Sequence, residues 1–249
     1  DGRPRDHWQA FLTSLARLGD EQIDRRFAAA DRHIRDLGIS YRVYGETKER
    51  SWPLSRVPLL VPGREWRQIA AGVAQRAELM ESILADVYGA GGLVAEGSLP
   101  AAAVAGSPDF LRPMIGARPP GGRWLRLYAC DVGRGPDGRW WVLGDRAQAP
   151  SGTGYALENR LVLSRAFPTL YRDMNVERLA PFFREFRAGL VAAAPRPEPR
   201  ICLLSSGPYS ETYFEQAYLA RYLGVLLVEG DDLVLQDGAV HVRTIAGLR

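Results

Sequence analysis

Two aspartates and a group of polar side chains stand within one short stretch, DVGRGPDGRWWVLGDRAQAPSGTGYALENR, at residues 131–160. Asp131 and Asp145 lie in runs that read as strands, and carboxylates are the ligands that hard cations prefer. Glycines near the end of the stretch would let backbone N–H groups approach an anion. Guanidinium, amide and hydroxyl groups that could hold phosphate or carboxylate accompany the aspartates: Arg134, Arg146, Gln148, Ser151, Asn159 and Arg160.

The strand-like runs WLRLYACDV and RWWVLGD flank the turn letters PDG at residues 136–138 and predict a β-hairpin. If Gly138 takes the left-handed position of a three-residue loop, Asp131 faces Leu143 and shares one face with Asp145. The two carboxylates would then lie close enough to hold a cation between them. A two-residue loop would place them on opposite faces. The alternative interpretation is that both aspartates only solvate the strand ends.

A second candidate is the turn SSGPYS at residues 205–210, after the strand-like run RICLLSS. We expect a helix to begin near Ser210, so that its free N–H groups point into the crevice at the carboxyl end of the strand. Gly207, Pro208 and Tyr209 are the candidate ligand-binding residues of this turn. An ordinary connection between strand and helix is the alternative.

The surrounding elements predict a protein of α/β (α+β) class with two domains, at residues 1–193 and 200–249. Residues 200–230 read as strand, glycine-containing turn, helix and strand, which is a Rossmann-like half unit, and a hairpin around QDG follows it. The clearest linker is APRPEP at residues 194–199. Helical periodicity is expected over further stretches: residues 6–19, 20–38, 64–89, 155–163 and 175–193.

The composition narrows the classes of protein. With 249 residues, 46% of them hydrophobic, and a net charge of +3, the chain is globular and gives little support for nucleic-acid binding. No apolar run approaches the ~20 residues that cross a bilayer, and no signal segment opens the chain, so we expect a cytoplasmic protein without membrane partners.

Cys130 and Cys202 read as buried free thiols in a reducing compartment, with a disulfide as the alternative. The chain lacks an initial Met and is expected to be part of a longer protein.

Several common sites are absent from the sequence. The three histidines, His7, His33 and His241, are far apart and have no ligand partners at zinc spacing. No G-x-S-x-G or Walker A motif occurs. Trp140 and Trp141 are interpreted as core residues rather than as stacking platforms.

The chain resembles the circularly permuted ATP-grasp proteins of type 2, whose relatives include glutathionylspermidine synthase-like ligases. The resemblance implies part of a circularly permuted ATP-grasp fold and a small Rossmann-like pre-ATP-grasp domain that is incomplete at its C-terminus. It covers most of the chain in the family's order, and it rests on four segments: YRVYGE (41–46), EWRQIAAGVAQRAELMESILADVYG (65–89), residues 131–160 and SSGPYSETYFEQAYLARYLGVLLVEG (205–230).

The resemblance also implies the chemistry of an ATP-dependent carboxylate–amine ligase. ATP and Mg²⁺ would activate a small carboxylate as an acyl phosphate, which an amine or peptide substrate attacks. Asp131 and Asp145 correspond to metal ligands, and the catalytic residues would be Arg134, Arg146 and Arg160. The remaining candidates would bind ATP or substrate: Gln148, Ser151, Gly152, Asn159, Gly207, Pro208 and Tyr209.

One departure from the family's pattern motivates an alternative function. In many relatives the second strand of the hairpin ends in Glu-Asp-Asn, whereas this chain has Gly144, Asp145 and Arg146. The alternative is a non-catalytic ATP-grasp-like module that binds a peptide or an anionic metabolite. The resemblance places the lysines and the adenine pocket after Arg249, so these residues alone are expected to have no ligase activity.

Overall fold

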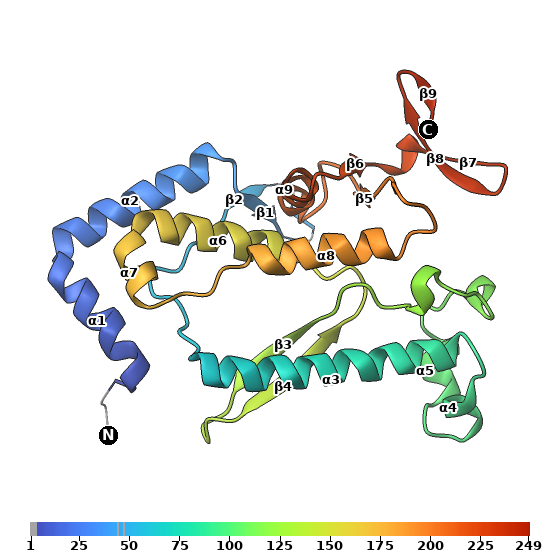
Figure 1. The fold of residues 1–249 in the computed structure, drawn as a ribbon, viewed down its shortest axis with the longest axis horizontal. Coiled ribbons are helices and arrows are strands. Elements are labelled where there is room, and N and C mark those ends of the chain that lie inside the picture. The colour runs from blue at the N-terminus through green and yellow to red at the C-terminus, as the bar shows by residue number, and fades with distance from the viewer. Residues whose placement is uncertain (1–3, 44, 47) are drawn as a thin grey trace. The chain divides into compact units, whose positions relative to one another are not determined.

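The computed structural model describes residues 4–43, 45–46 and 48–249, which form two compact units (Figure 1). Unit 1 combines Asp1–Leu60, Ser151–Gly189 and Glu198–Arg249, and unit 2 combines Val61–Pro150 and Leu190–Pro197. The predicted boundary between residues 1–193 and 200–249 stays a prediction. Tyr44 of the YRVYGE segment lies outside the described residues.

Unit 1 is built around one helix, α6 (Thr153–Ala166). It contributes buried residues to each of three apolar clusters: Tyr155 and Val162 to one, Leu163 to another and Leu157 to the third. A helix surrounded in this way is apolar on more than one face, as expected for a central helix. The other helices of unit 1 are α1 (Asp6–Leu18), α2 (Asp20–Asp36), α7 (Pro168–Asp173), α8 (Ala180–Ala192), whose last residues belong to unit 2, and α9 (Tyr213–Leu223).

The predicted helix over residues 175–193 begins too early. The chain forms α7, leaves the helical conformation at Asn175, which has a φ of 48°, and starts α8 only at Ala180. A left-handed residue ends a helix because it cannot continue the backbone ladder. The helices expected over residues 6–19, 20–38 and 155–163 are confirmed as α1, α2 and α6, apart from shifted ends.

The Rossmann-like half unit is confirmed in unit 1. Strands β5 (Cys202–Leu204) and β6 (Leu226–Val228) are parallel and α9 connects them. The QDG hairpin is also confirmed, because β7 (Leu233–Gln236) and β8 (Ala239–Thr244) pair antiparallel around Asp237 and Gly238, both with positive φ. The remaining strands are β1 (Ser40–Arg42), β2 (Glu49–Ser51) and β9 (Gly247–Leu248), and a 3₁₀ turn covers Gly230–Asp232.

Unit 2 consists of a long helix, α3 (Gly63–Val87), and a hairpin of β3 (Ala129–Arg134) and β4 (Trp140–Arg146) beside it (Figure 1). The helix confirms the prediction over residues 64–89. Among the described residues of unit 2 only Ile69 is buried. Short helical segments complete the unit: α4 (Gly92–Ala95), α5 (Ala101–Ala105) and 3₁₀ turns at Arg112–Met114 and Pro120–Gly122.

Two predictions of burial need correction. Cys130 and Cys202 are free thiols, as expected, but both are only partly buried. The side chain of Trp141 is 52% exposed, so it is not a core residue. In the part of the chain that the structure describes, no helix combines the length and the apolar character that crossing a bilayer requires.

Candidate functional site

The hairpin of unit 2 has the predicted loop. Gly135 N–H donates to the carbonyl of Arg139 at 2.8 Å, and Gly138 has a φ of 80°. These features confirm a three-residue loop with glycine in the left-handed position. From this loop Arg134 pairs with Trp140, and Val132 pairs with Val142.

The predicted register fails one pair further along. A β-bulge interrupts the pairing between Asp131 and Val132, so Asp131 faces Gly144 instead of Leu143. Leu143 is the extra residue of β4, and an extra residue shifts every pair beyond it. Asp145 consequently pairs with Cys130.

This shift separates the two aspartates. Directly paired residues share a face of the hairpin and neighbours along a strand alternate, so Asp145 lies on the face of Cys130 and Asp131 lies on the other. The prediction that Asp131 and Asp145 share one face is therefore wrong. A metal ion held between their carboxylates loses its geometric basis.

Asp145 lies on the face that packs against α3. The guanidinium of Arg76 donates to both carboxylate oxygens, at 2.5 and 2.7 Å, and the Tyr128 hydroxyl donates to one of them. The hydrogen bonds from Arg76 and then from Tyr128 lower the pKa of Asp145 to about 2. The carboxylate is thus ionised and already occupied by donors of its own unit. The sequence did not indicate that Arg76 would bind Asp145, because the two residues are 69 positions apart. It did not indicate the hydrogen bond from Tyr128 either.

Asp131 lies on the open face with Arg146 as its partner. Arg146 donates from Nη2 and Nε to Asp131 Oδ2 at 2.8 and 3.1 Å, and the two side chains are 57% and 53% exposed. The Arg146 guanidinium therefore occupies the carboxylate oxygen of Asp131 that a metal cation would need. Among the described residues no group of three or more His, Cys, Asp or Glu side chains could hold a metal ion. The donor set of the hairpin therefore does not fit the metal that the sequence pattern implied.

The other polar candidates of unit 2 differ in their surroundings. Arg134 donates to Glu65 Oε1 at 3.0 Å, and its guanidinium lies over the Trp140 ring, 5.7 Å from the ring centroid. Trp140 Nε1 donates to the second oxygen of Glu65 at 3.2 Å. These contacts fasten the hairpin loop to α3. Gln148 is exposed in the segment after β4.

In unit 1 the glycine-rich segment at the start of α6 binds an anionic group, which is the side-chain carboxylate of Glu215 in the same protein. Gly152 N–H donates to both oxygens of Glu215 at 2.7 and 2.8 Å, and Gly154 N–H donates to one of them at 2.7 Å. Glu215 is buried in α9. Burial raises its pKa, and the hydrogen bonds from Gly152 and Gly154 oppose this rise. The N-terminus of α6 is therefore capped from within, and the adjacent Ser151 is exposed.

The turn after β5 is held by a buried serine. Ser205 Oγ accepts from Gly207 N–H at 3.0 Å and donates to Gln216 Oε1 at 2.5 Å. Gly207 has a φ of 90°, and a Cβ added there would lie 3.1 Å from Glu229 Oε2. Only glycine suits this position, because the backbone is left-handed and a carboxylate lies close.

The helix after this turn begins at Tyr213 and not near Ser210, so the predicted start is wrong. Turns occupy the intervening residues, and the N–H groups of the GPYS stretch are not at the helix terminus. Pro208 and Tyr209 are exposed, and the Arg42 guanidinium of β1 lies 5.6 Å from the Tyr209 ring centroid. The turn therefore presents an aromatic ring at the surface of unit 1, beside the partly buried Arg42 of β1.

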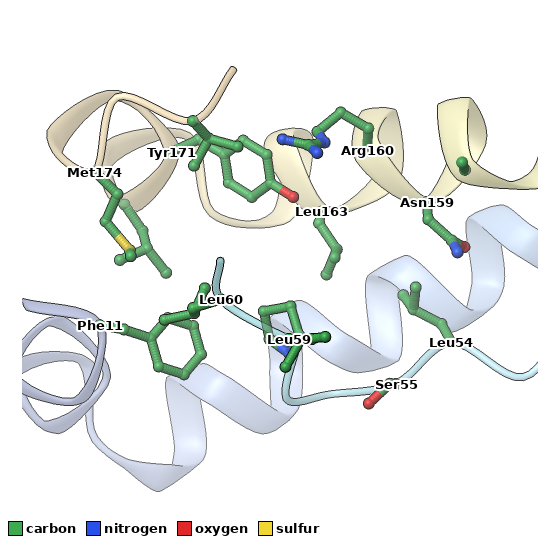
Figure 2. Close-up of a pocket in the computed structure, with 14 residues that line it drawn as sticks. Phe11, Leu54, Ser55, Leu59, Leu60, Asn159, Arg160, Leu163, Tyr171 and Met174 are labelled. Atoms are coloured by element: carbon green, nitrogen blue, oxygen red, sulfur yellow. The ribbon is translucent and has the colours of Figure 1, made fainter. Parts of the chain in front are cut away.

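Asn159 and Arg160 both lie on α6 and line a pocket of about 330 Å³ in unit 1 (Figure 2). Asn159 Oδ1 accepts from Trp52 Nε1 at 2.8 Å. Arg160 Nη1 donates to the carbonyl of Glu177 at 2.9 Å. The structure thus brings these two predicted residues together, along with Tyr171, which the sequence reasoning missed.

Comparison with known proteins gives one family. The family model for circularly permuted ATP-grasp type 2 matches residues 58–249. The chain is 36% identical to an uncharacterized protein of Mycobacterium tuberculosis (strain H37Rv) over 100% of its own length and 30% of the relative's. It is 32% identical to an uncharacterized protein of Synechocystis over 100% of its length and 52% of the relative's.

A named relative comes from Frankia alni. This protein, "Putative glutamate--cysteine ligase 2-3", is 36% identical over 96% of the chain and 28% of its own length. The chain thus spans between about a quarter and a half of the length of each of these three relatives.

Proposed function

The chain belongs to the circularly permuted ATP-grasp type 2 family, and from this premise we propose that the protein containing it is an ATP-dependent carboxylate–amine ligase. The observation that carries the proposal is the family match over residues 58–249. The name of the Frankia relative, which describes a ligase joining a carboxylate to an amine, supports it. A cytoplasmic location and small-molecule or peptide substrates belong to the same proposal.

The proposed reaction has two steps. A carboxylate oxygen of the first substrate attacks the γ-phosphorus of ATP, which forms an acyl phosphate and releases ADP. The amine nitrogen of the second substrate then attacks the acyl carbon, and inorganic phosphate leaves. Charge accumulates on phosphoryl oxygens, and fixed cations stabilise such charge most effectively when they are already oriented.

Arg146 is the hairpin residue best suited to that role. Its side chain is more than half exposed, and its Nε and Nη2 both donate to the carboxylate of Asp131. We assign Asp131 the role of orienting Arg146 towards an anionic group. Arg134 is less suited, because Glu65 and Trp140 already engage it. Family members use Mg²⁺, but no step here is routed through a metal, because the hairpin's donors do not fit one.

Phosphate release by the full-length protein tests the proposal. We expect ATP-dependent phosphate release with some mixture of amino acids, peptides and polyamines, and we expect Asp131→Asn to lower kcat by about tenfold or more. Asp137→Asn is the matched control, because Asp137 is an exposed hairpin aspartate that accepts from Arg139 N–H and pairs loosely with the Arg139 side chain. The absence of phosphate release with every mixture would reject the ligase.

The second candidate is a non-catalytic module that binds a peptide or an anionic metabolite. The observation that favours it is that both predicted metal carboxylates are paired with arginines on opposite faces of the hairpin. Calorimetric titration distinguishes the two candidates. Tight binding of an anionic ligand that is indifferent to ATP and Mg²⁺, together with no phosphate release, would support the module.

A further inference from the structure

The pocket in unit 1 has two kinds of wall (Figure 2). Its volume of about 330 Å³ lies at the lower end of the range for ligand sites, roughly 300–1,000 Å³. Figure 2 shows Arg160, Tyr171 and Asn159 on the α6 and α7 side, above the segment around Leu54 and Leu60. Apolar side chains provide most of the remaining lining: Phe11, Leu54, Leu60, Leu163, Leu170 and Met174.

Arg160 supplies an unpaired positive charge to this pocket. Its one hydrogen bond is to the carbonyl of Glu177, and among the described residues no carboxylate forms an ion pair with it. The residue is half-buried in α6. Its hydrogen bond to Glu177 is exposed, so the guanidinium remains accessible to an anion that would give it a charge-assisted partner.

The neighbouring polar groups are also donors. Asn159 uses its oxygen to accept from Trp52, which leaves its NH₂ group to donate. The Tyr171 hydroxyl has no hydrogen-bond partner among the described residues, burial raises the pKa of Tyr171, and the nearby Arg160 charge opposes that rise. Of the residues that the structure describes, no Asp or Glu lines the pocket. The wall therefore offers a guanidinium, an amide and a hydroxyl to one end of a ligand, and has no negative charge to attract a cation.

We propose that this pocket binds a small amphipathic carboxylate, with its carboxylate on Arg160 and Tyr171 and its hydrocarbon part on the apolar wall. A carboxylate matches the wall because it accepts from several donors at once and supplies the missing counterion. The hydrocarbon part would cover Leu60, Leu163 and Met174, and burial of apolar surface stabilises it there. The site does not depend on the ligase reaction, since all of its residues lie in unit 1 and binding requires no ATP.

Calorimetric titration of the intact chain with sodium octanoate tests the proposal, with octanamide and octylammonium as matched probes. The three share a hydrocarbon chain and differ in the charge of the head group. Octanoate is expected to bind. The affinity of octanamide is expected to be lower by about tenfold or more, because octanamide lacks the charge-assisted hydrogen bonds. Octylammonium is expected not to bind.

Two variants test whether the carboxylate head group of octanoate binds to Arg160 and Tyr171. Arg160→Met keeps an apolar side chain of similar length and removes the charge, so octanoate affinity should fall by about tenfold or more. Tyr171→Phe removes only the hydroxyl and should weaken octanoate about threefold. The control is Arg165→Met, because Arg165 lies on the same helix, contacts His33 and does not line the pocket. It should change octanoate affinity by less than about twofold.

Circular dichroism of each variant, before titration, shows whether its helices are intact. Equal affinity for octanoate and octanamide would overturn the proposal, as would absence of octanoate binding to the wild-type chain. Unchanged octanoate affinity in both Arg160→Met and Tyr171→Phe would overturn it as well. Loss of phosphate release in the full-length protein would bear only on the ligase, so the two proposals can fail separately.

Discussion

At the scale of single residues, Glu215 and Gly154 show how closely α9 meets α6. A Cβ added to Gly154 would lie 2.8 Å from Glu215 Cγ and 3.3 Å from Leu219 Cγ. Both contacts are with side-chain stems in a buried region, so Gly154→Ala must push α9 away or break the cap. We expect this variant to lower the free energy of unfolding by about 1–3 kcal/mol, measured by urea denaturation.

Gly189→Ala is the matched control for this prediction. Gly189 lies inside α8, and a Cβ added there meets no atom of the described residues within 4 Å. Alanine in an exposed helix interior is favoured over glycine by roughly 0.5–1 kcal/mol, so this variant should be slightly stabilising. Similar effects of the two substitutions on unfolding would contradict the close contact between Gly154 and α9.

At the scale of elements, the register of the β3–β4 hairpin determines whether a metal can bind. Because Asp131 faces Gly144 and is paired with Arg146, we expect the chain to bind no Mn²⁺ at the hairpin. The double variant Gly144→Asp with Arg146→Ala would place two carboxylates opposite each other on one face without the competing guanidinium. It should gain Mn²⁺ binding, measured by the loss of the free-ion signal in electron paramagnetic resonance.

Arg146→Ala alone is the control, because it removes the cation without adding a ligand. It should bind Mn²⁺ more weakly than the double variant. A single Mn²⁺ on the wild-type chain that disappears in both Asp131→Asn and Asp145→Asn would show that the two carboxylates do share a metal, contrary to the register.

The same hairpin shows what the sequence could and could not predict. The turn, the strands and the left-handed Gly138 depend on neighbouring residues, and all three were predictable. The bulge at Leu143 depends on how β4 packs, and no local pattern signals it. Glu215 was missed for a related reason: it binds Gly152 and Gly154 across more than 60 positions of sequence. The family resemblance nevertheless identified the fold, because it depends on matching sequence segments and does not require that contacts between distant residues be predicted.

At the scale of the whole molecule, the two units differ in how much apolar surface they bury. Unit 1 has three buried clusters around α6, whereas among the described residues of unit 2 only Ile69 is buried. Local opening is easiest where few buried contacts must be broken. We expect backbone amides of residues 153–166 to exchange with deuterium about tenfold or more slowly than those of residues 129–146, after correction for intrinsic rates.

Mass spectrometry of deuterated peptides measures this difference in the intact 249-residue chain. Peptides from α3 serve as the internal comparison, because they belong to the same unit as the hairpin but have their hydrogen bonds within a single helix. They should exchange more slowly than the hairpin, whose ladder opens when one strand detaches. Protection of the hairpin equal to that of α6 would show that unit 2 is stabilised by more than its own buried residues supply.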